Sequence, residues 1–386
     1  MVLLGLTSFL NDLSSEMIMP ILPLFIASLG GSGLAVGIIG GLRESIESLL
    51  KVFWGWWSDR TGKRKVLLIW GYFISAIFKF LLAFAKVWPH ILVFAALERV
   101  GKGVRVAPQE AIIADSMPQE KGYGFGIHRA LDTAGAIVGS LTVFFLFWRW
   151  GFSFKAIILT AALLALLSFI PLSFVGEKKK EPQQITLKIS LRALSLPAKL
   201  FILISAIFVL ANFSYMFFIL RTQEVLKNLA WGEKWTVGLP ILGYVLFNIA
   251  YAGLAVPCGI VSDQVGRRKI LITGYLLFAL TCLGFVFVKA ISGLIFLFIL
   301  YGIVYALVEG NSRAYIADLS PAEFRATALG TFHTTVGLVA LPSSLIAGFL
   351  WQNISPQATF IYGATVGALP AVLFLALRGY FAGSQQ

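Results

Sequence analysis

Long apolar segments separated by short polar ones dominate this chain. A membrane helix needs about 20 predominantly apolar residues, because each residue advances about 1.5 Å through a hydrocarbon core roughly 30 Å thick. The segments that meet this requirement are residues 3–29, 34–57, 66–86, 89–113, 123–147, 152–175, 199–222, 236–258, 270–288, 291–313, 325–350 and 357–379. The pattern therefore predicts an all-α membrane protein with twelve transmembrane helices.

The composition indicates that lipid surrounds most of the side chains. Of 386 residues, 58% are hydrophobic and 13% are charged, about half the charged fraction of a soluble domain. In a soluble protein the formal net charge of +13 would suggest nucleic acid binding. Here most Lys and Arg lie in short loops, where they set orientation and contact anionic lipid headgroups. We therefore expect membrane lipids as partners, and no nucleic acid.

The distribution of basic residues also predicts an orientation. Loops on the side of the N-terminus carry most of the Lys and Arg, so both termini are expected in the cytoplasm, with the protein in the cytoplasmic membrane. The first apolar segment lacks a charged region before it and a small-residue cleavage site after it, so it is expected to stay as a helix. Cys258 and Cys282 lie in apolar segments without metal-ligand spacing, and no metal or cofactor is expected.

A short polar turn occurs twice, each time between two predicted helices. The first copy contains Gly55, Asp59, Arg60 and Gly62, and the second contains Gly259, Asp263, Gly266 and Arg267, with the shared Gly and Asp positions 204 residues apart. Each copy ends in a run of basic residues. Residues 111–120 and 314–323 form a second pair of similar segments. Two repeats at nearly one spacing indicate an internal duplication.

The repeated turn resembles the loop that follows the second helix of each half in the major facilitator superfamily of secondary transporters. That loop reads roughly G-x-x-x-D-R-x-G-R-R, and this chain departs from it at Lys63 and Gln264. The resemblance implies two pseudo-symmetric six-helix bundles that rock about a central site, with the two turns as conformational gating loops.

The longest polar segment divides the predicted helices into two groups of six. We expect an N-terminal bundle at 1–176, a cytoplasmic linker at 177–198 and a C-terminal bundle at 199–386. The end of the linker is amphipathic and basic, which suits a segment lying on the membrane surface.

Ionisable residues inside the predicted helices are the candidates for function. A charge at the bilayer centre costs about 2.5–3.5 kcal/mol on insertion scales, so such residues must face partners or water. The third, sixth, ninth and twelfth segments hold almost none, and the third holds only Lys79. In the superfamily that this chain resembles, these four helices are peripheral and the others line the cavity. The candidate cavity residues are Arg43, Glu47, Lys102, Arg105, Arg129, Asp132, Asn212, Asn248 and Glu309.

Proton coupling is predicted from acids in the first helix and an arginine in the fourth. Asp12 and Glu16 are four residues apart and share a helical face. Two acids this close in a low-dielectric site resist joint ionisation, so one of them suits a proton carrier. The alternative is that both pair with basic residues and only hold the bundle together. Residues 98–103 include Glu98 and Arg99, and 99–103 resemble the superfamily's fourth-helix pattern R-x-x-Q-G, which implies that Arg99 assists proton movement.

Three further patterns leave alternatives open. Arg43, Glu47 and Lys51 are spaced four residues apart. They either line the cavity or form a ladder of ion pairs along one helix. His128 is a proton carrier or, as we favour, a hydrogen-bonded structural histidine. The spacing of Gly135 and Gly139 resembles the fifth-helix glycine motif of antiporters, but Ser140 stands where that motif has Pro, which puts an antiport assignment in doubt. The glycines at 122, 124 and 126 are expected to relieve close packing.

These observations favour a secondary transporter that uses a proton gradient to export an amphipathic, drug-like small molecule. The chain holds no P-loop, so ATP-driven transport by it alone is not expected. The alternative is uptake or facilitated transport of a small anionic metabolite, attracted by Arg43, Lys102, Arg105 and Arg129. A non-transporting sensor or membrane enzyme is a remote alternative, because no H-E-x-x-H or G-x-S-x-G motif occurs. We expect a monomer without enzymatic activity.

Overall fold

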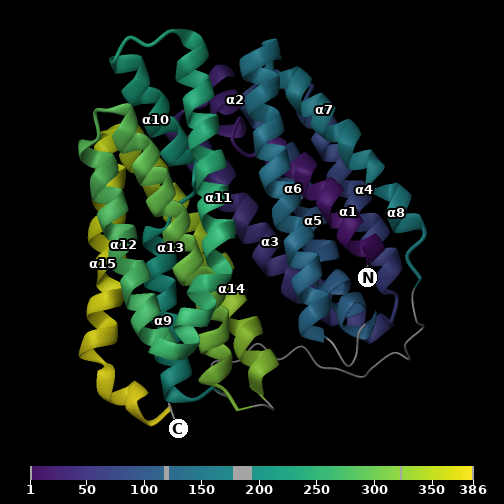
Figure 1. The fold of residues 1–386 in the computed structure, drawn as a ribbon, viewed down its shortest axis with the longest axis vertical. Helices are drawn as coiled ribbons and strands as arrows, with labels where there is room; N and C mark the ends of the chain where they lie inside the picture. Colours follow the sequence, from purple (N-terminus) through teal and green to yellow (C-terminus); the bar gives the residue numbers. More distant parts are fainter. Residues whose placement is uncertain (1, 117–120, 177–193, 322–323, 385–386) are drawn as a thin grey trace. The chain divides into compact units, whose positions relative to one another are not determined.

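The computed structural model describes residues 2–116, 121–176, 194–321 and 324–384. Within these residues the chain forms helices joined by short turns and contains no strand. The helices are α1 (Val2–Ile18), α2 (Leu22–Ser28), α3 (Gly33–Thr61), α4 (Arg64–Leu82), α5 (Trp88–Ser116), α6 (Lys121–Trp150), α7 (Phe154–Leu167), α8 (Phe169–Ser173), α9 (Leu196–Ala211), α10 (Met216–Asn228), α11 (Glu233–Val265), α12 (Arg267–Phe287), α13 (Ile291–Asp318), α14 (Arg325–Asn353) and α15 (Pro356–Ala376), followed by a 3-10 helix, Arg378–Ser384 (Figure 1).

The helices have the number and length that the sequence predicts. Ten segments of the described chain are long and apolar enough to cross a membrane, and three of them join two successive helices: α1 with α2, α7 with α8, and α9 with α10. Helices α3 and α5 complete the twelve. Each has 29 residues but carries more ionisable side chains than the others. The predicted all-α architecture is therefore confirmed.

The chain divides into two compact units. The first comprises residues 1–31, 42–187 and 233–242, and the second comprises 32–41, 188–232 and 243–386. The start of α3 is thus grouped with the second unit, and the start of α11 with the first. Most of the predicted linker, residues 177–193, lies outside the described residues.

Glycines set the tightest helix contacts of the first unit, which are those of α4 with α5 and of α1 with α6. A Cβ atom on Gly101 would lie 2.7 Å from the backbone nitrogen of Ser75 on α4. A Cβ atom on Gly135 would lie 2.5 Å from the carbonyl oxygen of Phe9 on α1, and one on Gly139 would meet the carbonyl oxygen of Leu13. Small residues therefore let these backbones approach closely.

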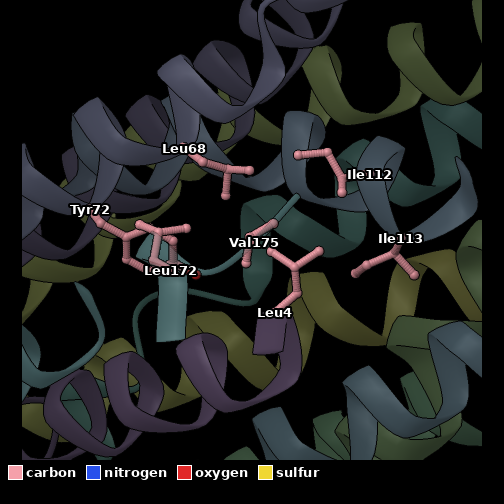
Figure 2. Packing of buried hydrophobic residues seen from close by; sticks show 7 residues of the cluster. All are labelled: Leu4, Leu68, Tyr72, Ile112, Ile113, Leu172 and Val175. Atoms are coloured by element: carbon pink, nitrogen blue, oxygen red, sulfur yellow. The ribbon is translucent and has the colours of Figure 1, made fainter. Parts of the chain in front are cut away.

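Near one end of the first unit, buried apolar side chains join three helices to the residues after α7. Figure 2 shows this cluster, which consists of Leu4 from α1, Leu68 and Tyr72 from α4, Ile112 and Ile113 from α5, and Leu172 and Val175 from the segment that follows α7. The exposed fraction of each is 5% or less. The cluster fixes the start of α4 against the end of α5, where the first polar turn lies.

Within the described residues, three predicted spans are interrupted, which the sequence analysis did not anticipate, and two of the interruptions are longer than one residue. Helix α1 ends at Ile18 and α2 begins at Leu22, because Pro20 lacks the N–H group that a continuous helix requires. Helix α9 ends at Ala211 and α10 begins at Met216 without any proline between them. There the backbone N–H of Ser214 donates to the Ser344 hydroxyl over 3.1 Å, and this bond to a side chain replaces a helical one.

The glycine contacts lead to a stability prediction. Gly101→Ala places a methyl group against the α4 backbone, and we expect it to lower the free energy of unfolding by about 1–3 kcal/mol. The matched control is Gly253→Ala, because no atom lies within 4 Å of the added Cβ there. The control is expected to stabilise its helix by about 0.5–1 kcal/mol. Thermal unfolding of the purified variants in detergent measures both, and equal midpoints for the two would contradict this packing.

Candidate functional site

Ion pairs link α3 to α5 in the interior of the first unit. The Glu47 carboxylate lies 2.7 Å from Arg99 Nη1 and 3.0 Å from Lys102 Nζ. Glu98 lies 3.3 Å from Arg99 Nε and 3.6 Å from Arg43 Nη2. Glu98, Arg99 and Arg43 are each 5–6% exposed, so their charges must be balanced locally. Three of these four ion pairs join α5 to α3, and the fourth lies within α5. None of the four is a pair within α3, as an ion-pair ladder of Arg43, Glu47 and Lys51 would require.

The break between α1 and α2 lies against the same charges. Met19, in the break, has its sulfur 3.2 Å from Arg43 Nη2 and 3.1 Å from Arg99 Nη2. A thioether is only a weak acceptor. The two guanidinium groups that balance Glu47 and Glu98 are therefore also directed at the interrupted first helix.

A hydrogen-bonded network joins α1, α4, α5 and α6. The Tyr72 hydroxyl donates to Gln109 Oε1 over 3.2 Å, and Gln109 Nε2 donates to the Ser8 hydroxyl. His128 Nε2 lies 2.7 Å from Gln109 Nε2, and its Nδ1 lies 3.3 Å from Asp132 Oδ2. The Gln109 amide and the Ser8 hydroxyl thus face one ring nitrogen of His128, and Asp132 faces the other. This arrangement supports the structural interpretation of His128.

Asp12 has Asp132 as its acidic neighbour. The Asn11 amide donates to Asp12 Oδ1 over 3.4 Å. The charged groups that act on Asp12 most strongly are Asp132, Lys102, Arg105 and Lys79. The sequence suggested Glu16, one turn further along α1, as the second acid of a pair. That pair stays a prediction, and Asp132 on α6 is a further acid that acts on Asp12.

Arg105 is a buried cation of this region whose guanidinium group is incompletely hydrogen-bonded. Its side chain is 3% exposed, and its guanidinium carbon lies 4.5 Å from the centre of the Tyr72 ring. Within the described part of the chain, its Nε and Nη2 atoms have no hydrogen-bond partner. Arg129, which the sequence analysis also assigned to the cavity, lies on α6 and is exposed.

The candidate residues of the second unit lie among aromatic side chains. The Tyr251 hydroxyl donates to Glu309 Oε2 over 2.7 Å, and Arg313 pairs with the other carboxylate oxygen. The ring of Phe247 lies 5.2 Å from that of Tyr305, which lies 6.0 Å from that of Tyr251. We call Phe247, Tyr251, Tyr305 and Glu309 the aromatic cluster. Its rings were missed by sequence reasoning, because Phe and Tyr occur throughout the chain.

The predicted asparagines of the second unit are placed differently from each other. Asn248 is buried, with an exposed fraction of 8%, and follows Phe247 on α11. Asn212 lies where α9 ends, and its Oδ1 atom is buried without a hydrogen-bond partner in the described residues. Across those residues, no group of three or more His, Cys, Asp or Glu side chains is arranged to hold a metal ion.

Each polar turn is closed by an arginine between two aspartates. Arg64 pairs with Asp59 over 2.8 Å and with Asp115. Arg267 lies 2.9 Å from Asp263 and 2.5 Å from Asp318. Arg60, a predicted gating residue, lies over the Trp56 ring, 5.4 Å from its centre. Arg64, in the basic run that ends the turn, is the residue that bridges.

Both turns depend on a glycine in the left-handed region. Gly62 has a φ of 67° and Gly266 a φ of 101°, values that cost a residue with a side chain about 1–2 kcal/mol. Each glycine ends one long helix and lets the next begin within two residues. The repeated Gly, Asp and basic positions therefore form the same kind of turn once in each compact unit.

Comparison with known proteins gives the family of the chain. Residues 4–243 and 230–382 match the sequence pattern of the Major Facilitator Superfamily. An uncharacterized MFS-type transporter of Methanocaldococcus jannaschii is 51% identical over 375 residues, covering 97% of this chain and 93% of that protein. The multidrug resistance protein MdtG of Citrobacter koseri is 28% identical over 297 residues, covering 73% of this chain and 70% of MdtG.

A solved structure agrees with the fold. The crystal structure of the nucleoside transporter NupG superposes with a TM-score of 0.79, covering 99% of this chain and 98% of NupG. The sequence identity is 15%, so this likeness establishes the fold alone. Family and fold together describe a multi-pass membrane protein that transports a small molecule and is not an enzyme.

The arginine between two aspartates leads to a testable prediction. Arg64→Gln removes charged hydrogen bonds to Asp59 and Asp115, and we expect it to lower the free energy of unfolding by about 1.5–3 kcal/mol. Arg60→Gln is the matched control, because Arg60 lies in the same turn and contacts a ring instead. Thermal unfolding in detergent compares the two. A larger loss for Arg60→Gln would reverse the assignment.

Proposed function

The chain belongs to the Major Facilitator Superfamily, and we propose that it is a proton-coupled transporter that exports an amphipathic, drug-like small molecule by alternating access. Protons moving down their gradient drive export if one carboxylate binds a proton in one state of the transporter and releases it in the other. The observation that carries the proposal is Asp12 on α1, with Asp132 as its acidic neighbour.

The surroundings of Asp12 suit reversible protonation. Asp132 on α6 is its acidic neighbour, and Lys102, Arg105 and Lys79 are its cationic neighbours. These charges are of opposite sign and come from α4, α5 and α6. A small movement of α1 relative to α5 or α6 therefore changes the balance, which is what coupling between protonation and conformation requires.

The aromatic cluster supports an amphipathic substrate. Phe247, Tyr251 and Tyr305 offer ring faces and hydroxyl groups, and Glu309 offers a carboxylate. Ring faces bind apolar and weakly polar groups without demanding one hydrogen-bonding pattern. The similarity to MdtG, whose name describes a multidrug resistance protein, points the same way.

One observation favours the alternative of a small anionic metabolite. Arg105 has two buried guanidinium nitrogens without a hydrogen-bond partner in the described residues, and a guanidinium fork suits a carboxylate or phosphate. Lys102 and Arg43 favour it less, because both already pair with carboxylates. The test compares ligand binding by the wild-type protein and by Arg105→Gln. If Arg105→Gln no longer binds small anions but still binds amphipathic cations, this alternative is supported.

We further propose that the protein lies in the cytoplasmic membrane as a monomer with both termini in the cytoplasm. The support is the excess of Lys and Arg in the loops on the side of the N-terminus.

The proposed coupling is tested in proteoliposomes. A pH gradient should drive ethidium, an amphipathic cation, across the membrane by the wild-type protein. Asp12→Asn removes the protonatable group, so the gradient should no longer drive flux, while exchange of ethidium across the membrane without a gradient should continue. Glu110→Gln is the matched control, because Glu110 pairs with Lys51 near the surface and its side chain is 48% exposed. Gradient-driven flux that persists in Asp12→Asn would end the proposal.

A further inference from the structure

The buried cation of the third predicted span has no part in the function proposed above. Lys79 lies on α4 and is 1% exposed. Within the described residues, no carboxylate lies within ion-pair distance of its ammonium group, which is surrounded by neutral oxygens instead. Burying an ammonium group costs several kcal/mol even after the surrounding protein relaxes. A helix expected to be a peripheral support thus carries a costly charge into the interior of the unit.

The oxygens around Lys79 come from one helix. The ammonium group donates to the Ser15 hydroxyl over 2.9 Å and to the Ser14 hydroxyl over 3.1 Å. It also lies 3.4 Å from both the backbone oxygen and the side-chain oxygen of Asn11. These four oxygens all belong to α1, the helix that carries Asp12. Lys79 therefore fixes the interior face of α1 to α4.

Asn11 connects this oxygen group to Asp12. Its side-chain oxygen accepts from Lys79, and its side-chain nitrogen donates to Asp12 Oδ1 over 3.4 Å. Asn11 is 1% exposed, so water does not compete for either end of the amide. Because one planar amide makes both contacts, the ammonium group determines which way the amide faces, and the amide determines how the carboxylate is held.

On its other side Lys79 faces Glu98 across a small cavity. The cavity has a volume of about 10 Å³ and is lined by Ser15, Arg43, Lys79 and Glu98, among others. Glu98 Oε1 is buried and has no hydrogen-bond partner in the described residues. A space of this size with several polar groups suits about one water molecule, which would connect the Lys79 ammonium group to this oxygen.

The charges around the two groups come from every neighbouring helix. Those acting on Lys79 most strongly are Glu98, Arg105 and Arg99 from α5 and Asp12 from α1. Asp12 additionally interacts with Asp132 from α6 and Lys102 from α5, and Glu16 lies one turn further along α1. Lys79 thus has one carboxylate of α1, Asp12, and one of α5, Glu98, among its charged neighbours.

We propose that Lys79 is a positioning residue for proton binding at Asp12: through Asn11 it orients the carboxylate, and with its charge it sets the pH at which Asp12 takes up a proton. This inference rests on the proposed proton coupling and deepens it. It assigns a functional role to a helix that the charge pattern placed among the supports. Lys79 contacts neither the proton nor the substrate in this arrangement.

The test is the pH dependence of gradient-driven ethidium flux in proteoliposomes. Lys79→Met removes the charge and the contact with Asn11, so Asp12 should bind a proton more readily, and the pH of half-maximal flux should rise by about one unit. Asn11→Ala keeps the charge and removes only the connection, so its shift should be smaller and in the same direction. If Lys79→Met does not fold, Asn11→Ala alone tests the connection to Asp12.

Arg221→Met is the matched control. Arg221 is also a buried cation, 4% exposed, but it donates to the carbonyl oxygens of Phe285 and Val286 at the end of α12 and pairs with Glu224. Its loss should lower the unfolding temperature and leave the pH of half-maximal flux unchanged. An unchanged pH dependence in both Lys79→Met and Asn11→Ala would overturn the inference. If Asp12→Asn also kept gradient-driven flux, the proposed coupling itself would fail, so the two failures are distinguishable.

Discussion

The need to balance charge away from water determines the interior of the first unit. An ionised side chain inside a membrane protein is tolerated only beside an opposite charge, several hydrogen-bond partners or water. The carboxylate of Glu47 therefore holds two cations of α5, and Lys79 holds four oxygens of α1. These interactions join helices that have no hydrophobic reason to associate in lipid. Charge balance therefore decides which helices of the first unit associate.

The sequence predicted the features that depend on composition and local spacing. Apolar length gave the twelve segments, and the repeated Gly-Asp-basic pattern gave both polar turns. It could not predict which side chains meet across helices. The acids around Asp12 are one example: Glu16 is apparent from its spacing along α1, whereas Asp132 acts on Asp12 from α6, which packs on α1 through Gly135 and Gly139. A helical spacing rule describes one helix and says nothing of its neighbour's rotation.

The two polar turns show how a sequence alignment can mislead about function. Aligned by their glycines, Arg64 corresponds to Arg268, whereas the bridging residue of the second turn is Arg267. Each bridging arginine is, however, the first residue of its helix. One residue of slip rotates a side chain by about 100° about a helix axis. The position relative to the helix start therefore decides which basic residue reaches both aspartates, and Arg268 instead donates to the Phe374 carbonyl over 2.5 Å.

The duplicated halves have diverged in chemistry more than in architecture. Both contain an interrupted first span, but the first unit surrounds it with ion pairs, whereas the second places Tyr and Phe rings around Glu309. Charged networks respond to protons, and aromatic faces accept molecules of varied shape. Under the coupling proposed above, such divergence would let one half carry the coupling ion and the other the substrate. A substitution in the first unit would then alter the pH dependence of transport, and one in the aromatic cluster the choice of substrate.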